Sequence, residues 1–202
     1  MTKILYLFIT CQKNFDNKYP KILSMMNKLN YTDYLIVVGG YNTNSIDLIN
    51  KVLKLNCNDF YEGLPEKVIK SLKYVYENLY KYDFYCKLDD DVDIYEIMPN
   101  TLLSNYSGTV SNQFTGDRRW HIGKCSTFSK FNTTEYKGIY VPWCSGGDGY
   151  FLSYDIMKYV VNDTTYFDEI YEDLYIAKLL RINKIYPTHI PNIYTYMKPN
   201  DK

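Results

Sequence analysis

The sequence predicts an α/β fold with a largely parallel β-sheet flanked by helices. Short β-rich apolar runs alternate with segments of helical periodicity, which is the pattern of a chain that returns to the same sheet edge through helices. The run YLIVV at residues 34–38 is continuously apolar, as expected of a strand buried on both faces. With 202 residues and 46% apolar residues, the chain is expected to form a single domain over residues 1–202.

The first half of the chain carries the clearest elements. Apolar residues recur at helical spacing over residues 16–29 and 64–79, and Pro65 suits the first turn of the second helix. Four strands are predicted, at residues 3–10, 34–38, 52–55 and 84–88. The second half is less regular, with strand candidates at residues 107–114 and 138–141 and a helix candidate at residues 171–180.

Composition and charge exclude several functions. Lys plus Arg equal Asp plus Glu at 23 each, and no basic stripe or polybasic segment argues for nucleic acid or an anionic membrane. The early apolar run at residues 4–9 is too short to span a bilayer, and no cleavage-site pattern follows it. The five cysteines are scattered and are expected to be reduced. We therefore expect a cytoplasmic protein without a membrane anchor.

The stretch YCKLDDDVDIY, residues 85–95, places three acids directly after a predicted strand. In open α/β sheets, ligands bind outside the carboxyl ends of the strands. Carboxylates there suit Mg²⁺ or Mn²⁺, which usually bridge to substrate phosphates and would relieve the repulsion among Asp89, Asp90 and Asp91. The alternative is a solvated acidic turn, but the buried strand before the acids and the apolar segment after them favour a metal site.

Two later stretches carry further candidates. In VPWCSGGDGYFLS, residues 141–153, Gly146 and Gly147 permit close backbone approach to a ligand, and Trp143 offers a flat face to a sugar. The alternative is a Gly-rich turn between strands. In DEIYEDLYIAKLL, residues 168–180, Glu172 and Asp173 fall in the first turn of a helix, where the dipole favours acids. The functional alternative is that one of them is a general base.

Taken in order, these stretches resemble the inverting β1,3-glycosyltransferases, the family of β1,3-galactosyltransferases, fringe and mucin-core galactosyltransferases. A strand enters the DDD motif at residues 82–91, and residues 145–153 (SGGDGYFLS) resemble the family's Ser-Gly-Gly-x-Gly-Tyr-x-Leu-Ser segment. Residues 172–174 (EDL) resemble its Glu-Asp-Val motif, and residues 59–67 (DFYEGLPEK) resemble the start of the helix before DDD. The ordered match, over about residues 59–180, is more specific than any single motif.

The resemblance implies a GT-A glycosyltransferase fold, a UDP-sugar donor and a Mn²⁺ (or Mg²⁺) cofactor. The sugar would be a hexose or N-acetylhexosamine, and the acceptor a glycan, glycoprotein or other hydroxyl compound, with a β1,3 linkage. The implied metal ligands are Asp91 and His189, with Asp89 orienting the ribose or the metal waters. The donor-binding set expected from it is Thr10, Asp59, Lys67, Asp89, Asp90 and Asp91.

The implied catalytic base is Asp173, with Glu172 kept as the alternative, and the sugar cleft would be lined by Trp143, Gly146, Gly147 and Asp148. Asp148 stands where relatives carry a small residue, so it either selects substrate hydroxyls or is a surface turn acid. Two other classes stay open: a catalytically silent sugar-nucleotide-binding scaffold, and a metal-dependent nucleotidyl or phosphoryl transferase. The second would need a phosphate-binding loop such as GxxxxGK[ST], which the sequence lacks.

Overall fold

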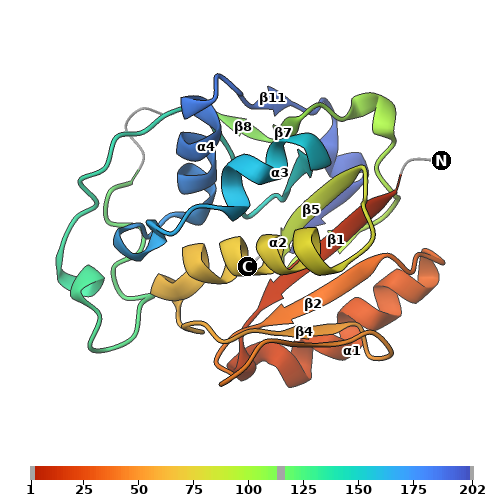
Figure 1. Ribbon diagram of the computed structural model, residues 1–202, viewed down its shortest axis with the longest axis horizontal. Coiled ribbons are helices and arrows are strands. Elements are labelled where there is room, and N and C mark those ends of the chain that lie inside the picture. The colour runs from red at the N-terminus through yellow and green to blue at the C-terminus, as the bar shows by residue number, and fades with distance from the viewer. Residues whose placement is uncertain (1–2, 113–116, 201–202) are drawn as a thin grey trace.

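An eight-stranded, mostly parallel β-sheet forms the centre of the structure (Figure 1). The computed structural model describes residues 3–112 and 117–200, apart from the side chain of Phe167. Across the sheet the strands follow the order β11 (Thr188–His189), β7 (Tyr106–Gly108), β10 (Tyr150–Ser153), β5 (Phe84–Asp89), β1 (Ile4–Thr10), β2 (Tyr34–Val38), β4 (Val52–Lys54) and β3 (Ser45–Asp47). Of these described strands, only β10 and β3 run antiparallel to their neighbours. The predicted α/β class is confirmed.

The central strand β1 explains where the site forms. All seven of its residues are buried, because β2 and β5 flank it and both faces of the sheet are covered. The register places Thr10 beside Val38 of β2 and Ile9 beside Asp89 of β5. The carboxyl ends of three parallel strands therefore meet at one edge of the sheet, which is the edge where open α/β sheets bind ligands.

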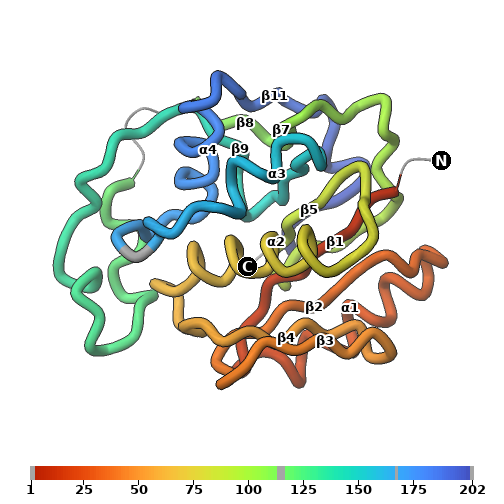
Figure 2. Tube along the Cα trace, viewed as in Figure 1, coloured from red at the N-terminus to blue at the C-terminus, as the bar shows by residue number. Residues whose placement is uncertain are grey.

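Helices cover both faces of the sheet, as Figures 1 and 2 show. One hydrophobic cluster joins α2, α3 and α4 to one face, and a second joins α1 to the other. The bounds of the four α-helices are α1 (Gln12–Lys28), α2 (Leu64–Asn78), α3 (Tyr154–Val161) and α4 (Glu172–Ile182). Two short strand pairs complete the described elements: β6 (Val92–Ile94) with β12 (Met197–Pro199), and β8 (Val110–Ser111) with β9 (Trp143–Cys144).

Helix α1 begins four residues before the predicted start. Asp59 lies far from it in sequence, yet its Oδ2 accepts a hydrogen bond of 2.7 Å from the backbone N–H of Gln12, the first residue of the helix. Residue 11 makes no side-chain cap, so this distant carboxylate satisfies one of the free N–H groups that a helix start exposes. A cap supplied by a residue far away in the sequence is not visible in the local pattern. The start of the helix was therefore predicted four residues too far along the chain.

The segment 117–142 lies to one side of α2 and α4 and contains no strand or α-helix (Figures 1 and 2). The strand predicted at residues 138–141 is therefore wrong. Arg118 Nη1 donates to the carbonyls of Tyr136 and Gly138 at 2.7 and 3.1 Å, so a side chain satisfies backbone that a strand partner would otherwise bind. The strand predicted at 107–114 is present as the short β7 and β8, and residues 113–114 lie outside the described residues.

Candidate active site

A cleft of about 670 Å³ opens at the carboxyl edge of the sheet, beside the end of β5 and the start of α4. Its walls come from the start of α2, the Gly-rich loop after β9 and the segment 117–142. The residues that line it are Tyr61, Leu64, Lys87, Asp89, Asp117, Trp120, Lys124, Tyr140, Trp143, Ser145, Gly146, Gly147, Ile170, Tyr171, Glu172, Asp173 and Leu174. Three predicted motifs, far apart in sequence, thus share one cavity.

The acid triplet does not face the cleft as a unit. Asp89 lines the cleft, whereas Asp90 turns towards α1. Its Oδ2 accepts a 2.6 Å hydrogen bond from Thr10 Oγ1, and its Oδ1 lies 3.3 Å from Lys18 Nζ. The carbonyl of Asp91 accepts a 2.7 Å hydrogen bond from the N–H of residue 200. The structure therefore makes Asp90 an anchor of the triplet, not a wall of the cleft.

Glu172 is sealed into the floor of the cleft. Only 4% of it is exposed, its Oε1 lies 2.6 Å from Lys87 Nζ, and its Oε2 accepts a 2.8 Å hydrogen bond from the Tyr150 hydroxyl. Burial raises the pKa of Glu172 to about 7, although the Lys87 ammonium opposes that rise. Both carboxylate oxygens are thus engaged by fixed side chains.

Asp173 is held differently. Its Oδ2 accepts a 2.9 Å hydrogen bond from the Gly146 N–H, and its Oδ1 accepts a 2.7 Å bond from the Leu174 N–H. Burial raises the pKa of Asp173, and the bond from Gly146 opposes the rise. Backbone donors fix the orientation of this carboxylate, and each oxygen keeps a second lone pair for a ligand. Asp173, half-buried on the cleft wall, is the more accessible carboxylate of the two neighbours.

The packing of the Gly-rich loop against the neighbouring carboxylates explains the presence of Gly146. A Cβ atom on Gly146 would come within 2.5 Å of Glu172 Oε1, so only glycine fits between that acid and the loop. A Cβ atom on Gly147 would meet nothing within 4 Å, and Gly147 lines the cleft, so the space beside it is open. Gly149 has φ of +85°, in the left-handed region that favours glycine.

A comparison with known protein families identifies the chain. The sequence model of the galactosyltransferase family matches residues 42–191, a range that contains the acid triplet, the Gly-rich loop and α4. The chain belongs to the galactosyltransferase family. It is therefore a glycosyltransferase, and the expected resemblance to β1,3-galactosyltransferase relatives is confirmed at the level of the family. A search of curated proteins finds no match.

Three of the residues predicted to bind the donor, Thr10, Asp59 and Lys67, form a network in this glycosyltransferase that lies outside the cleft lining. Lys67 Nζ lies 2.6 Å from Asp59 Oδ1 and donates to the carbonyl of Thr10 at 2.8 Å. Asp59 also accepts hydrogen bonds from the N–H groups of Gln12 and Gly39, at the ends of β1 and β2. None of the three predicted residues lines the cleft. They fix the ends of β1 and β2 and the loops that follow these strands.

An aromatic wall faces these carboxylates, and sequence reasoning found only part of it. Trp143 was predicted, and Tyr140 packs on it with ring centroids 5.6 Å apart. Trp120, Tyr61 and Tyr171 also line the cleft, and the Trp120 side chain is 57% exposed. The available signal for Trp120 was a tryptophan next to two arginines, but the segment that carries it has no periodicity to place it.

His121 shapes this wall from behind and is inaccessible to a ligand. It is fully buried, with Nδ1 2.8 Å from the Tyr171 hydroxyl and Nε2 2.9 Å from the carbonyl of Thr134. Both ring nitrogens are therefore used in holding the 117–142 segment against the residue that precedes Glu172. This arrangement gives His121 a structural role.

Two predicted site residues lie elsewhere. His189 lines a separate depression with Val110, where the Val110 N–H donates to its Nδ1 at 3.4 Å. Asp148 does not line the cleft and lies beside Tyr194, whose pKa is raised by burial and then by the Asp148 carboxylate. Of the four residues expected to line the sugar cleft, Trp143, Gly146 and Gly147 do so and Asp148 does not.

The charges of the cleft fit a divalent cation shared with an anionic ligand. The lining holds four carboxylates (Asp89, Asp117, Glu172 and Asp173) and two ammonium groups (Lys87 and Lys124), a formal excess of two negative charges. Within the described residues, no group of three His, Cys, Asp or Glu side chains is gathered closely enough to hold a metal alone. Mg²⁺ and Mn²⁺ commonly use one or two carboxylates and complete their shell with phosphates and water.

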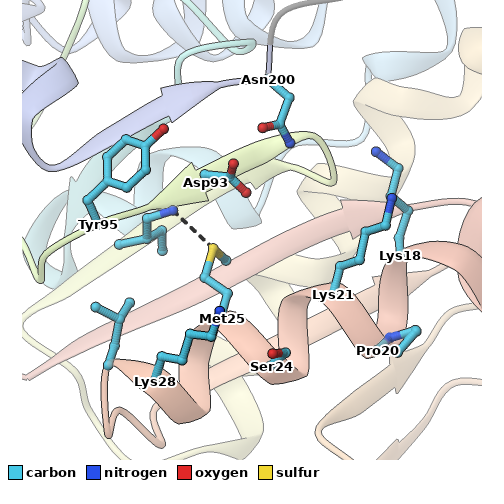
Figure 3. Close-up of a pocket in the computed structure, with 11 residues that line it drawn as sticks. Lys18, Pro20, Lys21, Ser24, Met25, Lys28, Asp93, Tyr95 and Asn200 are labelled. Carbon is cyan, nitrogen blue, oxygen red and sulfur yellow. Dashed lines mark hydrogen bonds between the residues drawn. The ribbon is translucent and has the colours of Figure 1, made fainter.

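A larger groove of about 1050 Å³ lies on the α1 face of the sheet and lacks such chemistry (Figure 3). Lys18, Lys21 and Lys28 project into it from α1, opposite Asp93 of β6. Lys18, which lines this groove, forms an ion pair with Asp90. In residues 3–112 and 117–200, no helix has the length and apolar character needed to cross a membrane.

Proposed function

We propose that this glycosyltransferase has a GT-A fold and transfers a hexose or N-acetylhexosamine from a UDP-sugar to a hydroxyl acceptor with inversion, using Asp173 as general base. The observation that carries the proposal is the contrast between two neighbouring carboxylates. Lys87 and Tyr150 occupy both oxygens of Glu172, whereas Asp173 is oriented by backbone N–H groups towards the cleft. The UDP-sugar donor and the β1,3 linkage rest on the resemblance to the family.

The reaction then needs one proton transfer by the protein. The acceptor hydroxyl oxygen forms a bond to the anomeric carbon on the face opposite the phosphate, and the bond from that carbon to the phosphate oxygen breaks. The hydroxyl proton passes to Asp173, and UDP leaves with the bonding electron pair. Asp173 must be ionised to accept the proton, and the hydrogen bond from Gly146 favours that state in spite of burial.

Asp89 and Asp91 would hold a Mn²⁺ or Mg²⁺ ion together with the diphosphate. Such an ion supplies stabilisation of the negative charge that develops on the leaving diphosphate. The position of Asp89 in the cleft lining supports its part in this assignment, and Asp91 follows from the resemblance to the family. His189 is left out because it lines a separate depression. The aromatic wall of Trp120, Tyr140 and Trp143 would receive the acceptor.

The test is release of UDP from a panel of UDP-sugars in the presence of Mn²⁺ and a mixture of saccharide acceptors. We expect release from one or a few donors, dependent on acceptor and abolished by EDTA. A catalytically silent scaffold would bind UDP without turnover. UDP binding of equal affinity with and without EDTA, or in Asp91→Ala, would contradict the metal assignment while leaving the transferase assignment in place.

A further inference from the structure

A single buried ammonium group joins the three segments that build the cleft. Lys87 is 1% exposed, and its Nζ lies 2.6 Å from Asp89 Oδ1 at the end of β5. It also lies 2.6 Å from Glu172 Oε1 at the start of α4 and donates to the carbonyl of Gly146, in the Gly-rich loop, at 3.2 Å. We infer that Lys87 is the positioning residue that sets the donor end of the cleft against its catalytic end. The inference rests on the proposed function.

The hydrogen-bond capacity of Lys87 shows that it acts through other residues. An ammonium group carries three protons, and Asp89, Glu172 and Gly146 supply three acceptors within hydrogen-bond distance. No donor is left for a substrate. Lys87 therefore cannot act as a catalytic residue or as a phosphate ligand, although it lines the floor of the cleft.

The same contacts reach Asp173 through one peptide unit. The Gly146 carbonyl accepts from Lys87, and the Gly146 N–H donates to Asp173 Oδ2. No side chain can intervene, because a Cβ at Gly146 would lie 2.5 Å from Glu172 Oε1 and 3.2 Å from Lys87 Nζ. Movement of the Lys87 ammonium would thus shift Asp89 and the Gly146 peptide together, and with the peptide the orientation of Asp173.

A simpler role for Lys87 would be to neutralise the buried Glu172 and nothing else. The two roles differ in what happens when Glu172 loses its charge. If Lys87 is only a charge partner, Glu172→Gln makes it dispensable. If Lys87 positions Asp89 and Gly146, it is needed whether residue 172 is charged or not.

The experiment compares four proteins: wild type, Lys87→Met, Glu172→Gln and the double variant Lys87→Met/Glu172→Gln. We expect Lys87→Met to lose stability because it leaves a buried carboxylate without its cation, and the double variant to recover most of the lost melting temperature. At saturating UDP-sugar, Mn²⁺ and acceptor, we expect kcat of the double variant to stay about 10²-fold below that of Glu172→Gln, since small displacements of catalytic groups cost about that much.

Two outcomes would overturn the inference: a double variant that turns over at the rate of Glu172→Gln, or one no more stable than Lys87→Met. Lys178→Met is the matched control. Lys178 pairs with Glu169 at 2.9 Å on the same helix as Glu172 but does not line the cleft. It should lose stability and keep its kcat. A wild type that releases UDP from no donor would refute the proposed function, which the comparison between variants does not test.

Discussion

Two lysines in this glycosyltransferase have similar burial and similar ion pairs but differ in their remaining contacts. Lys67 and Lys87 are 3% and 1% exposed, and each has an Asp carboxylate at 2.6 Å. The other partners of Lys67 and Asp59 are backbone groups of Thr10, Gln12 and Gly39, so this pair stabilises the fold and does not line the cleft. The partners of Lys87 are groups that line the cleft. A buried charge therefore does not by itself indicate a ligand-binding site. The difference lies in whether its remaining partners line the cleft.

The two sites also differ in charge balance. Lys67 faces one carboxylate, so that pair is neutral. Lys87 faces Asp89 and Glu172, and Asp173 follows next in the chain, so one ammonium is set against three carboxylates. Such an excess of buried negative charge is costly unless a proton or a cation joins it. At the cleft, burial raises the pKa of Glu172 to about 7, so a proton can relieve part of this excess.

The largest expected effect tests whether the reaction takes place among the residues around Lys87 and not among those around Lys67. Asp173→Asn should lower kcat by about 10²–10⁴-fold, the usual loss on removal of a general base. Asp59→Asn should instead raise the KM for the donor, because it loosens the ends of β1 and β2. Steady-state kinetics with varied donor will separate the two. Equal losses of kcat in both variants would remove the distinction between the two lysine sites.

The next effect is on stability. Lys87→Met should lower the free energy of unfolding by about 3–5 kcal/mol, since it strands a carboxylate that is 4% exposed. Lys67→Met should cost less, because Asp59 is 16% exposed and keeps two backbone N–H donors. Urea unfolding at pH 8 measures both, provided the m-values match. A larger loss for Lys67→Met would reverse the ranking.

A smaller effect appears in the pH dependence of stability. The pKa of Glu172 is raised in the folded state to about 7, so between its ordinary value of about 4.3 and about 7 the native protein keeps a proton that the unfolded chain has released. Stability should therefore fall as pH rises through that window, by at most about 1.4 kcal/mol per pH unit from this group. Glu172→Gln should flatten the slope. An unchanged slope would assign it to other groups.

The smallest effect is expected at Asp148, which lies outside the cleft. Asp148→Ala should change stability by no more than about 0.5 kcal/mol and leave the relative turnover of different UDP-sugars as it was. Competition between two donors in one reaction gives that ratio directly. A changed ratio would show that Asp148 reaches the substrate after all, and it would extend the functional region beyond the partners of Lys87.

The four parallel strands β1, β2, β4 and β5, helix α2 and the family could be predicted from the sequence. Local patterns are enough for these, because a run such as YLIVV or an apolar repeat over 64–79 carries its own periodicity. The resemblance to the family also implied one site built from the acid triplet, the Gly-rich segment and Glu172–Asp173, and of the triplet only Asp89 lines the cleft.

The contacts of each of those residues could not be predicted from the sequence. Asp90 turns to Thr10 and Lys18, Glu172 is sealed by Lys87 and Tyr150, and Asp148 leaves the cleft. The choice between Glu172 and Asp173 depends on partners far away in the sequence, such as Lys87 and Gly146. Part of the aromatic wall likewise belongs to a segment in which side chains such as Arg118 hydrogen-bond the backbone. That segment therefore shows no apolar periodicity from which its structure could be predicted. Hydrogen bonds between residues distant in sequence are set by packing, and a pattern along the chain does not record them.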